Sequence, residues 1–191
     1  MKYLELRNRL KENLFTALDI KKHFPEESES LLKIQLARFR ARGLVTKIKR
    51  GLYCFDPGTV EEFELAGKLY QPSYVSLESA LNYYGIIPDI PQAVVCLSLT
   101  NTKKITNQLG AFHYIKVKQD LFWGYQSRSK TQGVGSFLIA DKQKALLDYF
   151  YIRKIRSTSD LRLDLTDFDF GRYRKYAKFF PSWVQRIKIK Q

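Results

Sequence analysis

The chain has 191 residues, of which 45% are hydrophobic and 14% aromatic, so it can bury a core and is not expected to be disordered. Its formal net charge of +14 favours a polyanionic partner such as DNA, RNA or an acidic membrane surface, although such a charge can also serve solubility alone. The sequence has no apolar run of membrane-spanning length and does not begin with a signal peptide. We therefore expect a cytoplasmic protein that does not associate with membranes.

The charge is distributed unevenly along the chain. Residues 1–57 hold 13 basic and 7 acidic side chains, residues 58–141 hold seven of each, and residues 142–191 hold 13 basic and 5 acidic ones. A turn-forming cluster, Asp56-Pro57-Gly58-Thr59, follows the first basic segment. This pattern predicts an α/β (α+β) protein of two domains: a winged helix-turn-helix over 1–57, and a mixed α/β domain over 58–191 that ends in a basic helical tail.

Two helices are expected at the start of the chain, over about 2–12 and 16–24. In the second helix Thr16 is a suitable N-cap, and Asp19, three positions later, completes an approximate capping box. Pro25 comes directly after this helix and marks its end.

A third helix is expected from Ser28 or Ser30, both good N-cap residues, to a stop at Gly43. Its apolar side chains recur at helical spacing and should face a core. These side chains are Leu32, Leu36 and Phe39.

A hairpin should follow the third helix, with strands over 44–48 and 52–55 joined by the turn Lys49-Arg50-Gly51. Helix and hairpin together, over Ser28 to Phe55, carry seven basic residues and one acidic residue. A helix that buries one face can place the other in the major groove, and a basic hairpin behind it can lie on the neighbouring phosphates. This combination predicts a winged helix-turn-helix that binds double-stranded DNA.

The outer face of the third helix supplies most of the candidate DNA contacts. Ala37 and Ala41 are small enough to let the helix approach the groove, while Lys33 and Arg38 can reach guanine or phosphate and Gln35 can reach adenine. The alternative for the same residues is an ordinary solvated basic helix face. The predicted DNA-binding residues are Ser30, Lys33, Gln35, Arg38, Lys47, Lys49 and Arg50.

The second half of the chain has mixed helical and strand patterns. Helices are expected over 60–70, from Ser76 to Gly85, from Asp141 to Ile152, and after a capping box formed by Thr166 and Asp169. Strands are expected over 93–99, 104–106, 112–117 and 136–139. Cys54 and Cys96 lie in strand-like runs and should be buried free thiols, since no metal-binding spacing accompanies them.

The enzyme alternatives are weaker. Gly133-Val134-Gly135-Ser136 is similar to the glycine–serine turn of nucleotidyltransferases, with Asp148 at a suitable distance, but neighbouring carboxylates to hold magnesium ions are missing and a hairpin loop explains the glycines. The acidic residues between Asp160 and Asp169 are irregularly spaced and should form salt bridges with flanking arginines. His23 and His113 have no catalytic partner. We expect no enzymatic activity, metal or cofactor.

Four stretches of this sequence resemble the AbiEi family of antitoxins and transcriptional regulators from type IV toxin–antitoxin systems. They are RGLVTKIKRGLY (42–53), YQPSYVSLESALNYYGIIP (70–88), FHYIKVKQDLFWGY (112–125) and ADKQKALLDYFY (140–151). The resemblance implies a winged helix that represses its own operon, and a second domain that counters a nucleotidyltransferase-like toxin. By position it assigns DNA contact to Lys33, Arg38, Lys47, Lys49 and Arg50.

The chain departs from this family in two places. Where the family often has Ser-Pro-Glu-Lys-Ala, this sequence has Asp141-Lys142-Gln143-Lys144-Ala145, and it is short after the fourth stretch. A stand-alone regulator is therefore also compatible with the sequence. A further alternative is an interaction module that binds RNA or a protein partner through its basic C-terminal tail.

Overall fold

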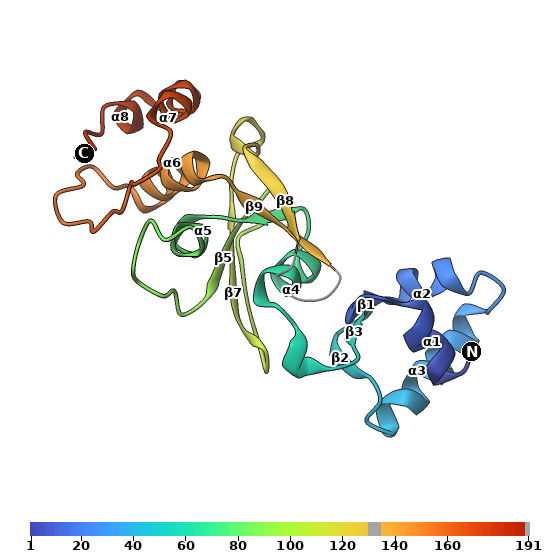
Figure 1. The fold of residues 1–191 in the computed structure, drawn as a ribbon. Helices are drawn as coiled ribbons and strands as arrows, with labels where there is room; N and C mark the ends of the chain where they lie inside the picture. Colours follow the sequence, from blue (N-terminus) through green and yellow to red (C-terminus); the bar gives the residue numbers. More distant parts are fainter. Residues whose placement is uncertain (130–134, 190–191) are drawn as a thin grey trace.

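A computed structural model describes residues 1–129 and 135–189, and its fold is of the α+β class (Figure 1). The N-terminal elements are α1 (Tyr3–Arg9), β1 (Leu14–Thr16), α2 (Ala17–His23), α3 (Glu29–Ala41), β2 (Thr46–Lys49), β3 (Leu52–Cys54) and the short 3-10 turn η1 (Pro57–Thr59). The later elements are α4 (Glu62–Leu69), β4 (Ser73–Val75), α5 (Leu77–Tyr83), β5 (Val94–Ser98), β6 (Lys103–Asn107), β7 (Gly110–Lys116), η2 (Gln119–Leu121), β8 (Tyr125–Ser129), β9 (Ser136–Ala140), α6 (Lys142–Arg153), α7 (Phe170–Ala177) and α8 (Ser182–Gln185).

The N-terminal elements form three helices and a small antiparallel sheet of order β1-β3-β2. The Thr16–Asp19 capping box that opens α2 is confirmed, and Ser28 is the residue that caps α3, accepting from the Leu31 amide at 3.2 Å. The hairpin turn is reduced to Arg50 and Gly51 because β2 extends to Lys49. Strand β1 was not predicted, because three residues between two helices give too short a pattern to recognise.

The later elements form a six-stranded mixed sheet of order β6-β7-β5-β4-β9-β8, in which β5 is parallel to β7 and β4 is parallel to β9. Helices α6, α7 and α8 lie together at the end of the molecule opposite to α1, α2 and α3 (Figure 1). The central strand β5 is buried throughout. Within the described ranges, none of the helices is both long and apolar enough to cross a membrane.

The small sheet has apolar side chains in both hydrophobic cores. Phe15 and Phe55 pack into the small core with α1, α2 and α3. Leu14, Leu52 and Cys54 instead belong to the large core beneath α4 and the six-stranded sheet. The parts of the chain before and after the predicted boundary at residue 57 are therefore held together by buried apolar contacts as well as by the covalent chain.

A lysine of α4 ties the two parts together by polar contacts as well. The ammonium of Lys68 donates to the Leu14 carbonyl at 2.7 Å and to the Glu12 carboxylate at 2.7 Å. It also lies 3.6 Å from Glu64. The polar and apolar contacts together fix how α4 sits against the small sheet.

Several predictions for the second half need correction. Strands β4 and β8 were not predicted, and the predicted helical tail contains one short helix, α8. Ser76 does stand at the start of α5, but its hydroxyl donates to Asp148 at 2.8 Å instead of capping the helix. Thr166 is not a cap either, because α7 begins later and Asp169 caps it by accepting from the Arg172 amide at 2.8 Å.

Cys54 and Cys96 are buried free thiols, as predicted. Burial, assisted by the charge of Asp56, raises the pKa of Cys54 to about 11 from an ordinary value of 9.0, and burial raises the pKa of Cys96 well above that value. Well below pH 9 both thiols are protonated in the folded and in the unfolded chain, so they contribute no pH dependence to the free energy of unfolding. Above that value only the unfolded chain loses these protons, which favours unfolding.

We therefore expect the free energy of unfolding to fall between pH 9 and pH 11, by up to about 1.4 kcal/mol per pH unit for each thiol. Urea denaturation at successive pH values measures this slope. The double variant Cys54→Ala, Cys96→Ala should show a flatter dependence, and an unchanged slope would contradict the assignment to the thiols.

Candidate nucleic-acid interface

Helix α3 separates its residues into a buried and an exposed face. Leu32, Leu36 and Phe39 are buried in the small core, as predicted. The opposite face is exposed to solvent along three turns of the helix. Its residues recur three or four positions apart, which places them on one side of the helix. They are Ser30, Lys33, Ile34, Ala37, Arg38 and Ala41, and we call this set the α3 stripe.

The charged groups of the α3 stripe are available to a ligand. Arg38 has no ion pair within the described part of the chain. Lys33 lies 3.7 Å from Glu29, but both side chains are about four-fifths exposed (78% and 82%), so water screens the pair and it contributes little. Arg38 and Arg40 also lie in the last turn of α3, where positive charge is favourable at the negative end of the helix dipole.

Two other predicted contact residues lie at the margins of this surface. Ser30 is exposed in the first turn, with its hydroxyl 3.0 Å from that of Ser28. Gln35 is half-buried, on the flank of the helix towards the core. The structure thus places Ser30 on the same face of α3 as Lys33 and Arg38, one turn from Lys33, and sets Gln35 apart from them.

The three predicted cations of the hairpin are all exposed, but one of them also makes a contact within the protein. Lys47 on β2 and Arg50 in the turn are exposed. Lys49 is directed to the second half of the molecule, where its ammonium donates to the Leu69 carbonyl at the end of α4 at 2.5 Å. Burial, and then the charge of Lys103, lower the pKa of Lys49.

Lys49 thus has a contact within the protein, and its role as a DNA-binding residue stays a prediction. The register of β2 against β3 shifts between Lys47 and Lys49, so a bulge re-aims the second side chain. Local alternation along a strand cannot reveal such a shift. Lys49 joins the hairpin to α4, while Lys47 and Arg50 stay available.

We expect Lys49→Met to lower the free energy of unfolding by about 1 kcal/mol, the value of a partly exposed charge-assisted hydrogen bond. The salt dependence of duplex binding should not change, since the ammonium faces α4. Lys47→Met is the matched control, and it should reduce the slope of log K against log salt concentration by about 1 with little effect on stability. Urea denaturation measures the free energy of unfolding, and salt titrations measure the slope for duplex binding. A reduced slope in Lys49→Met with no loss of stability would show that Lys49 contacts the duplex.

Sequence reasoning missed one residue of the α3 stripe. The side chain of Ile34 is 50% exposed in the middle of the face, between Lys33 and Arg38. An apolar side chain at such a place can pack against the methyl group of thymine in the major groove. Ile34 lies two residues from both Leu32 and Leu36, which places it on the side of the helix opposite to them. The helical spacing in the sequence was therefore sufficient to predict its exposure.

The alternative enzymatic residues are not brought together. Gly133 and Val134 of the glycine–serine turn lie outside the described residues. Asp148 is enclosed: its carboxylate accepts from Ser76 at 2.8 Å and from Tyr74 at 3.2 Å, and it also pairs with Lys144. All of these groups are buried. The prediction that the helix carrying Asp148 packs into the core is confirmed.

Among the described residues, the acidic side chains between Asp160 and Asp169 do not form the predicted salt bridges. Arg162 pairs with Asp89 at 3.3 Å, and Arg172 lies 4.0 Å from Asp141. No grouping of histidine, cysteine and acidic side chains within residues 1–129 and 135–189 is suited to hold a metal ion. His23 ends α2 and His113 lies in β7, in accordance with prediction.

A search of protein-family models and a search of curated proteins find no match to this chain.

Proposed function

We propose that the N-terminal elements form a winged helix-turn-helix that binds double-stranded DNA, and that the chain is a transcriptional repressor of its own operon. The observation that carries this proposal is the α3 stripe. It is a helix face that combines cations, small side chains and one exposed isoleucine, and the hairpin that follows α3 in the chain adds two exposed cations, Lys47 and Arg50. The order of helices and strands supports it, because α3 follows α2 after a short turn and the β2–β3 hairpin follows α3.

The shape of the α3 stripe favours duplex DNA over a flat anionic surface. The side chains of Ala37 and Ala41 are small, so the helix backbone can approach a ligand closely. Such an approach suits a helix that lies deep in a major groove. Lys33 and Arg38 stand five residues apart, at opposite edges of the stripe, and would reach base edges or phosphates. Lys47 and Arg50 would lie on the flanking phosphates and add affinity without sequence preference.

The antitoxin function is the second part of the proposal. Its support is the resemblance of the four sequence stretches to the AbiEi family, which implies a second domain that counters a nucleotidyltransferase-like toxin. We expect a reading frame for such a protein next to the gene of this chain. Co-expression of this chain should then relieve the growth arrest that the toxin causes, and growth arrest that persists would refute this part alone.

The duplex-binding proposal is tested by fluorescence anisotropy with a labelled duplex from the chain's own promoter and a scrambled duplex of equal length. We expect both to bind in dilute buffer, the promoter more tightly. For each duplex, a plot of log K against the logarithm of the salt concentration should be a falling straight line, with a slope of about −0.9 for each phosphate contacted. A flat anisotropy in dilute buffer would overturn the proposal.

A further inference from the structure

A hollow lined by basic and aromatic side chains lies at the end of the molecule opposite to α3 (Figure 1). Its volume is about 660 Å³, within the range of ordinary ligand sites. Three segments far apart in the sequence line it: the end of β7 with the loop after it, the last turn of α6 with the loop after it, and α8. The lining residues are Lys116, Val117, Lys118, Tyr151, Ile152, Lys154, Arg156 and Trp183.

The cations of this hollow are not neutralised by the protein. Lys116, Lys118, Lys154 and Arg156 are all exposed, and across residues 1–129 and 135–189 none of the four has an ion pair with a carboxylate. None of the described residues that line the hollow is acidic. Four positive charges that converge from separate segments repel one another, and the arrangement is stabilised when an anion lies among them.

The aromatic part of the hollow is a layered platform. The guanidinium of Arg156 lies over the indole of Trp183, 4.1 Å from the ring centre. Tyr151 lies beside the same indole at 26° to it, with ring centres 6.1 Å apart. A base cannot enter between rings so close together, so stacking must use an outer surface of the platform, and a guanidinium plane serves for this as well as an aromatic ring does.

We propose that this hollow binds single-stranded nucleic acid. A base would stack on the platform of Trp183 and Arg156, and the adjoining phosphates would lie among Lys116, Lys118 and Lys154. Proteins hold single strands by two components. Cations contact the phosphate backbone, and aromatic rings stack on the bases whatever their identity. An acidic peptide would need the charges but not the platform, and a duplex would keep its bases stacked inside and out of reach of Trp183.

The site is separate from the α3 stripe and uses different residues. Helices α6 and α8 lie at one end of the molecule and α3 at the other (Figure 1). Single-strand binding here and duplex binding at α3 therefore respond to different substitutions, and each can fail without the other.

The test is fluorescence anisotropy of the full chain with a labelled single-stranded RNA of mixed sequence, about 10 nucleotides long. Arg156→Glu should weaken binding about tenfold or more, because it removes both the charge and the stacking plane. Arg156→Lys keeps the charge but not the plane, and it should show an intermediate loss. Quenching of tryptophan fluorescence by the unlabelled strand should disappear in Trp183→Phe, and quenching that persists unchanged would overturn the placement of a base on this platform.

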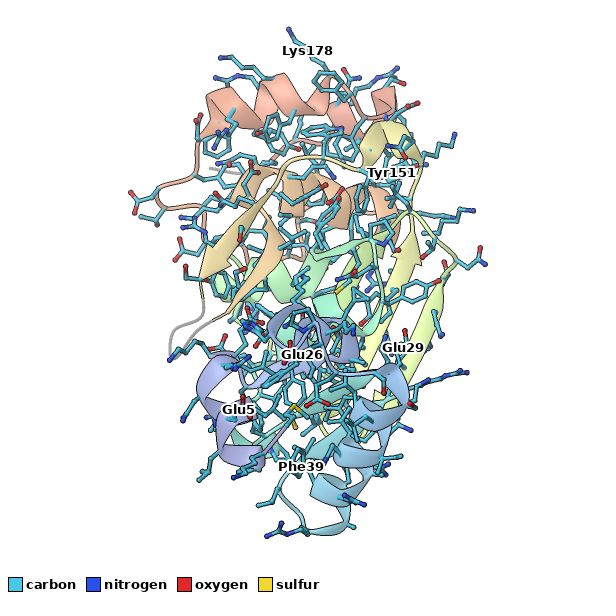
Figure 2. All side chains as sticks on the ribbon, turned by 90° about the vertical axis from the view of Figure 1, so that its right-hand side faces the viewer. Glu5, Glu26, Glu29, Phe39, Tyr151 and Lys178 are labelled. Atoms are coloured by element: carbon cyan, nitrogen blue, oxygen red, sulfur yellow. The ribbon has the colours of Figure 1, made fainter. Side chains whose placement is uncertain are left out.

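Lys178→Glu is the matched control, because it makes the same charge change at an exposed residue outside the hollow. Figure 2 shows Lys178 at the far end of the molecule, with its side chain directed away from Tyr151. Circular dichroism establishes that each variant is folded. An equal loss for Arg156→Glu and Lys178→Glu would overturn the proposal, as it would mean diffuse attraction to a basic surface. Competition by free AMP as effective as that by the strand would overturn the assignment to a strand.

Discussion

Lys144→Met is expected to lower the free energy of unfolding by about 3–5 kcal/mol, because it leaves a buried carboxylate without its counter-charge. The side chains of Lys144 and Asp148 are almost completely enclosed, with 0% and 2% of their surface exposed. The ammonium contacts one oxygen of Asp148 and donates to the Tyr74 hydroxyl at 3.0 Å. Water cannot replace the lost partner at such a depth.

The surroundings of this pair explain why the loss is large. Burial raises the pKa of Asp148 and lowers that of Lys144, and each charge opposes the effect on the other. The hydroxyls of Ser76 and Tyr74 donate to the second carboxylate oxygen. The ammonium also lies 5.2 Å from the centre of the Trp123 ring, which favours the charged form. In Lys144→Met the pKa of Asp148 rises further, and the carboxyl is expected to take up a proton.

Urea denaturation of three variants tests this account. The double variant Lys144→Met, Asp148→Leu should be considerably more stable than Lys144→Met alone, since apolar side chains of similar volume are compatible with the core. The control is Arg153→Ala, which breaks the partly exposed pair with Glu78 and should cost about 1 kcal/mol or less. A double variant no more stable than the single one would show that shape, and not charge, governs the site.

The second large effect is expected at Arg38. Under the proposed function, Arg38→Ala should weaken binding to the promoter duplex by about 1–3 kcal/mol and relax the preference for particular base pairs. The reason is that Arg38 stands on the exposed face of α3 without an ion pair among the described residues, so its guanidinium is free to bind two acceptors on guanine. Binding to a scrambled duplex should change little.

Competition assays with single-base variants of the promoter measure this preference. Lys11→Ala is the matched control, because Lys11 is an exposed cation of the same part of the chain that lies outside the α3 stripe. It should reduce the affinity for all duplexes slightly and equally. If Arg38→Ala also reduced specific and non-specific affinity equally, Arg38 would contact phosphate and another residue of α3 would read the bases.

The sequence predicted best what depends on a few neighbouring residues. The Ser28 cap, the Thr16–Asp19 capping box and the two faces of α3 follow from spacing along one helix, and the structure agrees with all of them. Strands β4 and β8 were missed because one has three residues and the other, Tyr-Gln-Ser-Arg-Ser, is exposed throughout and does not alternate.

What the sequence could not predict depends on distant partners. The direction of Lys49 is decided by a bulge and by the Leu69 carbonyl twenty residues away. Lys144 and Asp148 stand four positions apart on a helix, a spacing typical of a solvent-exposed ion pair. Their burial depends on Tyr74 and Trp123, which come from other parts of the chain.

The two apolar faces of the small sheet restrict how this protein can be taken apart. A fragment that ends at residue 57 would expose Leu14, Leu52 and Cys54 to water, all of which are covered in the whole chain. An apolar patch of this kind promotes self-association. A graft that transfers residues 1–57 to another scaffold must therefore supply apolar side chains in place of α4. A substitution that loosens α4 would alter the support of the small sheet without changing any residue of α3.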